Sequence, residues 1–369
     1  MKKIISLVLA LALVLGLCSF ASAEAVKKVG IAMPTQSLER WNRDGAYLQD
    51  QFKAAGYDVI LTYSDNDNDK QVNDIANMLS QNVDMLIISC IDSAGLNTVL
   101  DEAAEKGIPV IAYDRMIEND AVTYYVSFDN YTVGVLQGQF VKAALDLDNA
   151  GDKVFNMEFT GGAPTDPNAF YFFNGAYDQL KEYIEKGTIK VPSGQITMEQ
   201  VGTEQWSTDT ALSRAQNILG SYYADGTILD AWLCSNDSTA MGVAQAIAAD
   251  YAGDNEVLVT GQDADDANLI NIFEGKQSMS VYKNLANEVA VTLAVAKAAL
   301  EGEIDGQALA DSFDITVAFD TESYETTPGN KCPSFLLVPY VITKDNMQLL
   351  ADTGLYAWNA DNTYVQKVK

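Results

Sequence analysis

Histidine is absent from this chain of 369 residues. Its absence excludes Ser-His-Asp and Cys-His nucleophile systems, HExxH zinc sites and acid–base catalysis by imidazole. Phosphate-binding loops of the GxxxxGK or GxGxxG kind are also missing, as is the GxSxG elbow of hydrolases. Catalysis by carboxylates alone remains possible.

Cysteine is scarce, with four residues in the chain. Cys18 falls in the apolar N-terminal stretch, and the odd number that follows, Cys90, Cys234 and Cys332, does not suggest a disulfide framework. Their separations do not match those of a metal ligand set. We therefore interpret these three cysteines as structural and expect neither a metal nor a cofactor.

Basic side chains are few, since 23 lysines and arginines accompany 51 aspartates and glutamates, a formal net charge of -28. Lys2 and Lys3 belong to the N-terminal leader described below, so 21 basic and 51 acidic side chains follow it, a formal charge of -30. A negative field of this size repels nucleic acid and anionic lipid. We expect neither as a partner.

Long apolar runs are limited to one stretch, residues 4–17, which is shorter than the roughly 20 residues that span a bilayer. Two lysines precede it and an Ala-Ser-Ala exit ends at Ala23, which predicts a secretory signal peptide over 1–23, cleaved after Ala23. A lipid anchor at Cys18 is the alternative, although Leu17 is larger than the residue usual before a lipobox cysteine. We predict export to the periplasm or the outer face of the cell envelope.

Apolar, β-rich runs alternate with helical patterns along the rest of the chain. Strands that are apolar at nearly every position are typical of parallel sheets covered by helices on both faces. The alternation completes one α/β domain by about Phe128 and then restarts, without a Pro/Gly/Ser-rich linker. The length also favours two domains. The expected strands are 29–34, 59–64, 85–90, 110–114, 124–128, 154–159, 228–235, 257–261 and 279–282.

Charged, amide and aromatic side chains gather just after these strands, where doubly wound sheets bind ligands. Taken singly, an aspartate there is usually a helix cap and a tryptophan usually belongs to the core. As a set they favour a sugar cleft, because charged and amide groups hydrogen-bond to hydroxyls and aromatic faces cover the apolar face of a pyranose. The residues are Glu39, Arg40, Trp41, Asp114, Arg115, Asp166, Asn168, Trp206, Asn236, Gln262, Asp263 and Lys283.

Six ordered blocks, between about residues 29 and 341, carry a family likeness. The blocks are Leu38-Glu39-Arg40-Trp41, Ala112-Tyr113-Asp114-Arg115-Met116-Ile117, Ser127-Phe128-Asp129-Asn130, Ser235-Asn236-Asp237, Gly261-Gln262-Asp263-Ala264-Asp265 and Val281-Tyr282-Lys283. In these blocks the chain resembles the sugar-binding receptors of ABC importers, of the xylose-binding and multiple-sugar-binding type.

This resemblance implies a type I periplasmic binding protein fold, an α/β architecture of two doubly wound parallel-sheet lobes joined by three hinge crossings. It also implies a monomer that closes on one monosaccharide and delivers it to a membrane ABC permease. Some members also signal through a chemoreceptor. The crossings are expected near 126–129, 281–284 and 335–338.

By the same analogy, the N-terminal lobe would comprise 27–127 plus 284–336. The C-terminal lobe would comprise 128–283 plus 337–369. Segment 313–331 matches the family poorly and is interpreted as a surface excursion.

The resemblance assigns roles within the cleft. Trp41 is expected to stack on one face of the sugar and Trp206 on the other, and Glu39 and Asp166 are secondary candidates. The aromatic run at 169–173 favours the multiple-sugar type. The sugar therefore stays open among aldopentoses and aldohexoses such as xylose, glucose, galactose and arabinose. Hydroxyls would be held by Arg40, Asp114 and Arg115 from the first lobe and by Asn168, Asn236, Asp263 and Lys283 from the second.

Two other functions compete with transport. A sensory receptor for a membrane kinase or chemoreceptor would use the same site. A carboxylate-based glycosidase needs an acidic pair flanking the scissile bond, whereas the acids here are matched by Arg40, Arg115 and Lys283. A repressor of the same fold would begin with a helix-turn-helix instead of a leader. We expect a binding protein and not an enzyme.

Overall fold

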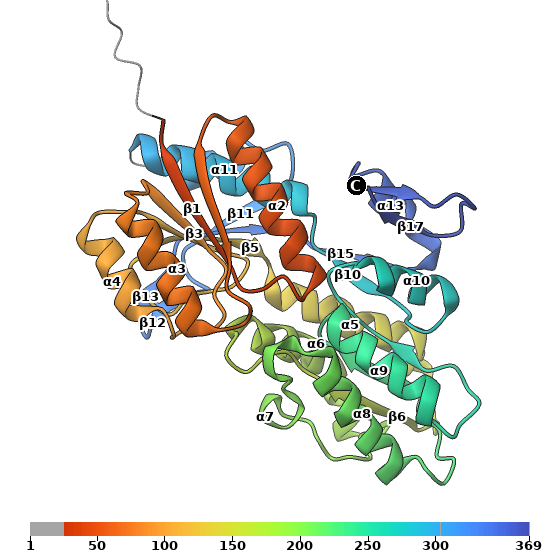
Figure 1. Cartoon of the computed structure of the whole chain (residues 1–369). Coiled ribbons are helices and arrows are strands. Elements are labelled where there is room, and N and C mark those ends of the chain that lie inside the picture. Colours follow the sequence, from red (N-terminus) through yellow and green to blue (C-terminus); the bar gives the residue numbers. More distant parts are fainter. Residues whose placement is uncertain (1–25, 303, 369) are drawn as a thin grey trace, which may run out of the picture.

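The computed structural model describes residues 26–302 and 304–368, so the predicted leader and the alternative anchor site at Cys18 lie outside the described residues. Two α/β lobes are connected by segments that pass from one into the other (Figure 1). None of the helices in this part of the chain is long and apolar enough to cross a bilayer. Cys90, Cys234 and Cys332 are buried free thiols, as their structural interpretation requires.

The first lobe is built on a seven-stranded sheet in the order β11-β14-β5-β4-β3-β1-β2. Neighbouring strands run parallel except for β11, which pairs antiparallel with β14 at the edge. The strands are β1 (Lys28–Met33), β2 (Asp58–Tyr63), β3 (Met85–Ile88), β4 (Val110–Tyr113), β5 (Val122–Phe128), β11 (Val317–Asp320) and β14 (Ser334–Leu337).

The edge strand β11 corrects one expectation, because part of the supposed surface excursion at 313–331 belongs to the sheet. In this strand of four residues, Val317 and Phe319 face the core. An alternation of apolar and other residues over so short a stretch does not identify a strand in the sequence. The rest of the segment does form a separate hairpin of β12 (Glu325–Thr327) and β13 (Asn330–Lys331).

Helices cover both faces of this sheet. Ile31 of β1 packs in one core with α2 and α11, while the next residue, Ala32, packs in the other with α3 and α4. Successive strand residues point to opposite faces, so a strand between two helical layers is apolar throughout, as predicted. The helices are α2 (Glu39–Ala54), α3 (Asn68–Ser80), α4 (Asn97–Glu105), α11 (Leu285–Glu301) and α12 (Gly306–Asp311).

The second lobe has a four-stranded parallel sheet in the order β7-β6-β8-β9. A parallel bridge between Gln262 and Val281 connects this sheet to the antiparallel pair of β10 and β15. The strands are β6 (Phe155–Thr160), β7 (Ile189–Lys190), β8 (Ala231–Cys234), β9 (Leu258–Val259), β10 (Ser280–Tyr282) and β15 (Tyr340–Ile342).

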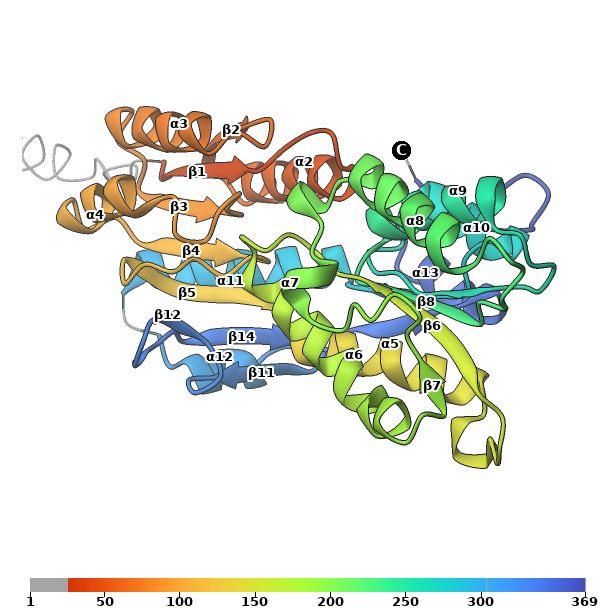
Figure 2. The same cartoon turned by 90° about the horizontal axis from the view of Figure 1, so that it is seen from below.

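Helices α5 and α6 lie side by side on one face of this sheet (Figure 2), and α8 and α9 cover the other. The close approach of α5 and α6 requires glycine, because a Cβ on Gly134 would lie 2.0 Å from the Phe172 carbonyl oxygen. The helices are α5 (Asn130–Ala144), α6 (Pro167–Glu185), α7 (Met198–Val201), α8 (Thr208–Tyr222), α9 (Asp237–Asp250) and α10 (Asp266–Glu274), with short 3-10 turns at Leu147–Asn149, Glu204–Trp206 and Lys344–Asn346.

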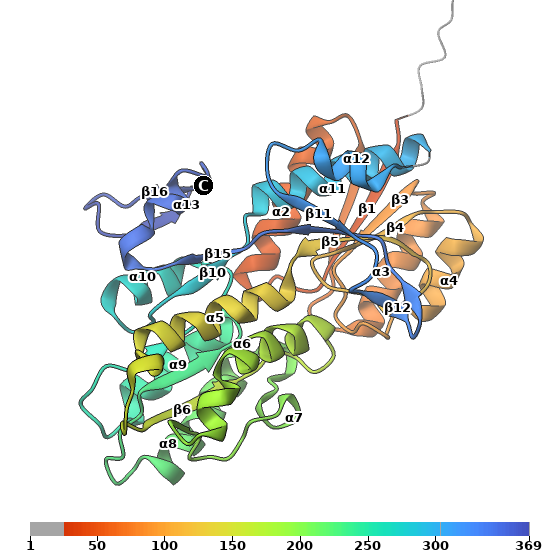
Figure 3. The ribbon, with the colours of Figure 1, turned by 180° about the vertical axis from the view of Figure 1, so that it is seen from behind.

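The chain passes into the second lobe after β5, returns after β10 and leaves again after β14, which are the three predicted crossings. The residue boundaries of the lobes stay a prediction. After β15 the chain forms a C-terminal unit beside α10 (Figure 3). It consists of α13 (Gln348–Ala351) and a hairpin of β16 (Tyr356–Trp358) and β17 (Val365–Lys367).

Candidate functional site

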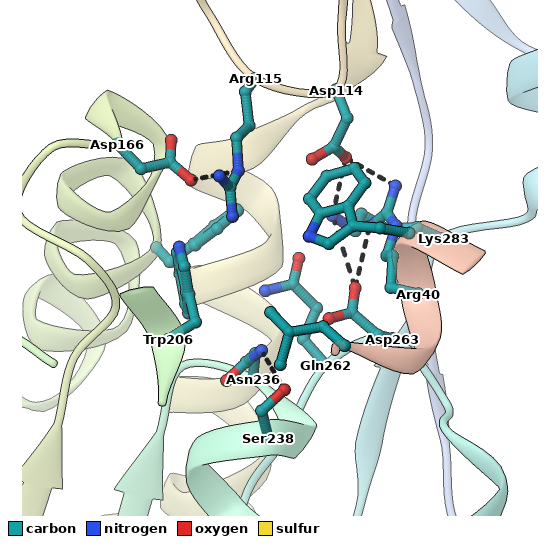
Figure 4. A pocket seen from close by; sticks show the side chains of 13 residues that line it. Arg40, Asp114, Arg115, Asp166, Trp206, Asn236, Ser238, Gln262, Asp263 and Lys283 are labelled. Atoms are coloured by element: carbon teal, nitrogen blue, oxygen red, sulfur yellow. Dashed lines mark hydrogen bonds and ion pairs between the residues drawn. The ribbon is translucent and has the colours of Figure 1, made fainter. Parts of the chain in front are cut away.

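A small cavity lies where the strand ends of the two lobes meet (Figure 4). Hydrogen bonds join the two lobes directly, for example from the Ser93 amide to the Thr165 carbonyl at 3.2 Å. The lining residues are Leu38, Arg40, Trp41, Asp114, Arg115, Asp166, Phe172, Trp206, Asn236, Ser238, Gln262, Asp263 and Lys283.

Local structure explains why these side chains point inward. Arg40 and Trp41 occupy the first turn of α2, directly after the loop that follows β1. Asp114 follows β4 with a left-handed backbone, φ 60°, which turns the chain sharply at the sheet edge. Asp166 and Asn236 cap the N-termini of α6 and α9. Asp166 and Asn236 therefore each cap a helix and line the cavity.

Arg40 is the centre of a buried ion-pair cluster that spans both lobes. Its Nη2 donates to Asp114 Oδ2 at 2.7 Å and to Glu288 Oε2 at 3.1 Å. Its Nη1 donates to Asp263 Oδ1 at 2.8 Å, and its Nε to Asp44 Oδ2 at 3.1 Å. Burial by itself lowers the pKa of Arg40, but the surrounding carboxylates outweigh this effect and raise that pKa well above its usual value. The guanidinium is therefore fixed in position and in charge.

Lys283 closes this cluster into an alternating ring of charges. Its Nζ lies 2.9 Å from Asp114 Oδ2 and 3.5 Å from Asp263 Oδ1. Burial raises the pKa of Asp114, but Arg40 and Lys283 outweigh it and hold that pKa at about 2. The pKa of Asp263 is lowered by the same two cations against its burial. Both carboxylates are thus ionised at neutral pH and able to accept charge-assisted hydrogen bonds from hydroxyls.

The opposite side of the cavity carries a single ion pair, from Arg115 Nε to Asp166 Oδ2 at 3.2 Å. Burial raises the pKa of Asp166, and the charge of Arg115 offsets this only in part. The guanidinium carbon of Arg115 lies 4.8 Å from the ring centroid of Trp41, in cation–π contact. Figure 4 shows Arg115, Asp166 and Trp206 facing Asp114, Arg40, Asp263 and Lys283 across the cavity.

Trp206 depends on a glycine for its place. A Cβ on Gly162 would lie 2.0 Å from Cη2 of the indole, so the ring lies directly against bare backbone. Phe172 supports the indole edge-on, with ring centroids 6.1 Å apart. The indole Nε1 is buried and has no hydrogen-bond partner among the described residues. It is therefore a free donor in the wall of the cavity.

Eight of the nine residues predicted to bind the ligand line the cavity, and the secondary candidate Asp166 does too. Asn168 lies behind the wall, where its Nδ2 donates to the Asp114 carbonyl oxygen at 2.7 Å and its Oδ1 accepts from Tyr125 at 3.1 Å. Its direct contact with a ligand stays a prediction. Glu39, the other secondary candidate, also faces away, toward the backbone amide of Asp266 at 3.3 Å.

Three of the lining residues, Leu38, Phe172 and Ser238, were not among the candidates from the sequence, and Gln262 was a cleft candidate without an assigned binding role. Leu38 begins one of the six blocks, and Ser238 lies two residues after Asn236. Phe172 stands in the aromatic run at 169–173. Nothing in its periodicity distinguishes this ring from those that α6 buries in the core.

Comparison with known proteins gives a consistent result. The model of a family described as "periplasmic binding protein domain" matches residues 29–304. The multiple sugar-binding periplasmic receptor ChvE of Rhizobium radiobacter is 38% identical over 96% of this chain and 98% of that protein. The D-xylose-binding periplasmic protein of Escherichia coli is 35% identical over 79% of this chain and 85% of its own length.

Among solved structures, a similar protein is an ABC transporter solute-binding protein from Clostridium phytofermentans with bound β-D-glucose. It is 44% identical and has a TM-score of 0.84, and the match covers 91% of this chain and all of that one. A carbohydrate transporter solute-binding protein from Chloroflexus aurantiacus, in complex with D-glucose, is 28% identical with a TM-score of 0.78, over 91% of this chain and 98% of that one.

Proposed function

This chain belongs to the periplasmic binding protein domain family, and from that premise we propose that its cleft captures one neutral aldose and presents it to a membrane ABC permease. The related proteins support a sugar as the ligand. The structure from Clostridium phytofermentans holds β-D-glucose, and the Escherichia coli relative is a D-xylose-binding protein. D-Glucose and D-xylose are therefore the first candidates.

The observation that carries this proposal is the balance of charge in the cavity wall. The three cations Arg40, Arg115 and Lys283 are matched by three acids, Asp114, Asp166 and Asp263. A charged ligand would bring an uncompensated charge into this buried site, which is strongly unfavourable. A neutral ligand with many hydroxyls can instead donate to the carboxylates and accept from the cations.

A receptor function fits these acids better than catalysis. Glycoside hydrolysis needs one carboxylic acid that donates a proton and a second carboxylate that acts as base or nucleophile. Asp114 and Asp263 are both held ionised by the same two cations, and Asp166 is engaged by Arg115. The family is one of solute-binding receptors.

The relatives are periplasmic proteins, so this chain functions outside the cytoplasm. We further propose that residues 1–23 direct export and are cleaved after Ala23, which releases a monomer. The permease is its principal partner. A chemoreceptor or sensor kinase that reads the closed form is a second partner compatible with the same site.

Isothermal titration of the mature protein, residues 24–369, tests the proposal directly. The panel contains D-glucose, D-xylose, D-galactose, L-arabinose, the polyol mannitol and the charged sugar glucuronate. We expect saturable binding of one or more neutral aldoses at 1:1 stoichiometry and weaker binding of glucuronate. A protein that binds none of the aldoses would contradict the proposal.

A further inference from the structure

The loop that carries Asp263 has an unusual backbone. Asp263 and Ala264 both adopt positive φ angles, 103° and 51°, a region that residues other than glycine rarely occupy. Such conformations persist where the surroundings determine them strongly. The loop positions the Asp263 carboxylate against Arg40 and Lys283 in the cavity wall, so whatever holds the loop also holds part of the site.

Three contacts from within the second lobe fix the amides of the loop, the first from the Asp263 amide to the Val281 carbonyl oxygen at 2.9 Å. The amide of Ala264 donates to Ser280 Oγ at 3.0 Å, and the amide of Asp265 donates to Asp237 Oδ2 at 2.9 Å. They leave the carbonyl oxygens of Asp263 and Ala264 to be satisfied. Both carbonyls face partners that come from other parts of the chain.

Arg43 and Tyr356 supply those partners. Arg43, one turn after Arg40 on α2, donates from Nη2 to the Asp263 carbonyl oxygen at 3.3 Å. The Tyr356 hydroxyl donates to the Ala264 carbonyl oxygen at 3.0 Å and accepts from Arg43 Nη1 at 2.9 Å. This single buried hydroxyl thus joins α2 of the first lobe to the binding loop of the second.

Tyr356 comes from the C-terminal hairpin, 93 positions after Asp263 in the sequence. It is 3% exposed and does not line the cavity. Its ring packs edge-on against Tyr282 of β10, with centroids 5.8 Å apart. The hairpin therefore reaches the back of the site at the point where the two lobes meet.

We propose that Tyr356 is a positioning residue for ligand binding, which ties Arg43 to the Asp263–Ala264 loop when the lobes close. This inference rests on the proposed capture of an aldose in the cleft. In the closed form the hydroxyl keeps Asp263 where it meets Arg40 and the ligand. When the lobes separate, the contact with Arg43 breaks and the loop loses one of its constraints. Closure and the geometry of the site are thereby coupled.

The test compares Tyr356→Phe with Tyr364→Phe, a matched change on the same hairpin. The Tyr364 hydroxyl makes no hydrogen bond to any described residue, although its ring packs on Phe273 at 5.9 Å. Stopped-flow fluorescence follows glucose binding, because Trp41 and Trp206 in the cavity wall report it. We expect Tyr356→Phe to weaken binding about tenfold, through faster dissociation, with the association rate little changed. Tyr364→Phe should bind as the wild type does.

Hydrogen exchange gives a second readout that does not require the ligand. The amides of Ala264 and Asp265 should lose protection in Tyr356→Phe and keep it in Tyr364→Phe. Equal affinity and equal exchange in the two variants would overturn the inference, as would equal losses in both, which would indicate a general role of the hairpin. A wild type that binds no aldose would contradict the proposed function, whereas tight binding by both wild type and Tyr356→Phe would contradict only the role of Tyr356.

Discussion

The two sides of the cavity differ in the number of ion pairs that hold their charged groups. On one side, Arg40 and Lys283 hold Asp114 and Asp263 through contacts of 2.7–3.5 Å. On the other, Arg115 has one carboxylate partner, and the indole nitrogen of Trp206 has no acceptor in the described part of the chain. The first side is thus preorganised by the protein itself, while the second has hydrogen-bonding capacity that a ligand can satisfy.

This difference indicates a division of labour. Fixed charges give strong, directional hydrogen bonds and position a ligand at little reorganisation cost. A less constrained wall with aromatic surface can accept ligands that differ in one hydroxyl, because ring faces contribute without exact hydrogen-bond matching. We expect changes on the first side to reduce binding of every sugar, and changes on the second to alter the choice among sugars.

The largest effect should follow Asp114→Asn, which keeps the shape of the side chain and removes its charge. Arg40 and Lys283 would then face each other with one buried carboxylate fewer between them. Breaking a buried, hydrogen-bonded charge pair costs about 2–5 kcal/mol of binding free energy, or roughly 30- to 5,000-fold in affinity. Titration with each aldose measures it, and a uniform loss is expected. An Asp114→Asn protein that binds like the wild type would contradict a role of this side of the cavity in sugar binding.

A Gly162→Ala change addresses the other side. The new methyl group would overlap the Trp206 ring, which lies 2.0 Å from its position. Overpacking of this kind costs about 1–3 kcal/mol, and we expect it as displacement of the indole and a roughly 10- to 100-fold loss of affinity that varies with the sugar. Titration against the aldose panel shows whether the order of preference changes.

Gly220 provides the matched control for that experiment. It lies in α8, where a Cβ meets no atom within 4 Å. Gly220→Ala should leave affinity unchanged and raise the free energy of unfolding by about 0.5–1 kcal/mol, since alanine loses less backbone entropy in a helix. Equal losses of affinity in both variants would contradict a specific role for Trp206.

Asn168→Ala should have a smaller effect. The amide holds the Asp114 carbonyl oxygen and the Tyr125 hydroxyl, and losing one such partner in a buried site costs about 1–3 kcal/mol. We expect about a tenfold loss of affinity, the same for each aldose, because the contacts are to protein. Titration with epimeric sugars decides between the two roles of Asn168, since losses that differ among epimers would restore the predicted direct contact with the ligand.

The sequence predicted the layers of the fold because strands covered on both faces are apolar at nearly every position, as Ile31 and Ala32 show. It missed β11, whose four residues carry too short an alternation. In the site, the residues that follow strands were predictable from the geometry of parallel sheets. Asp166 faces the cavity, whereas Asn168 supports it from behind. This difference depends on tertiary contacts, which the spacing of residues in the sequence does not encode.

The role of Tyr356 was beyond sequence reasoning for a different reason. Its hairpin does not follow a strand of either parallel sheet, so its position in the sequence does not indicate a binding site. It also lies far along the chain from the loop that it contacts. The positive φ angles of Asp263 and Ala264 also left no trace, because neither residue is a glycine. Long-range support of a strained loop becomes visible only when the fold places the partners together.

The smallest expected effect is a pH dependence that separates the two sides of the cavity. The pKa of Asp114 is held at about 2, and that of Asp263 is lowered by the same cations. Burial instead raises the pKa of Asp166 above the usual 3.8 despite the charge of Arg115. As the pH falls from 7 toward 4, Asp166 therefore takes up a proton before Asp114 and Asp263 do and stops accepting charge-assisted hydrogen bonds.

We expect affinity to fall a few-fold over that range, because a neutral hydrogen bond is roughly half as strong as a charged one. Asp166→Asn should bind weakly at pH 7 and show a flatter profile, since its side chain cannot titrate. Titrations at intervals from pH 7 to pH 4 compare it with the wild type, and circular dichroism confirms that both stay folded. If Asp166→Asn showed the same pH profile as the wild type, the titrating group would be another residue. The two sides of the cavity would then not differ in the protonation of their carboxylates.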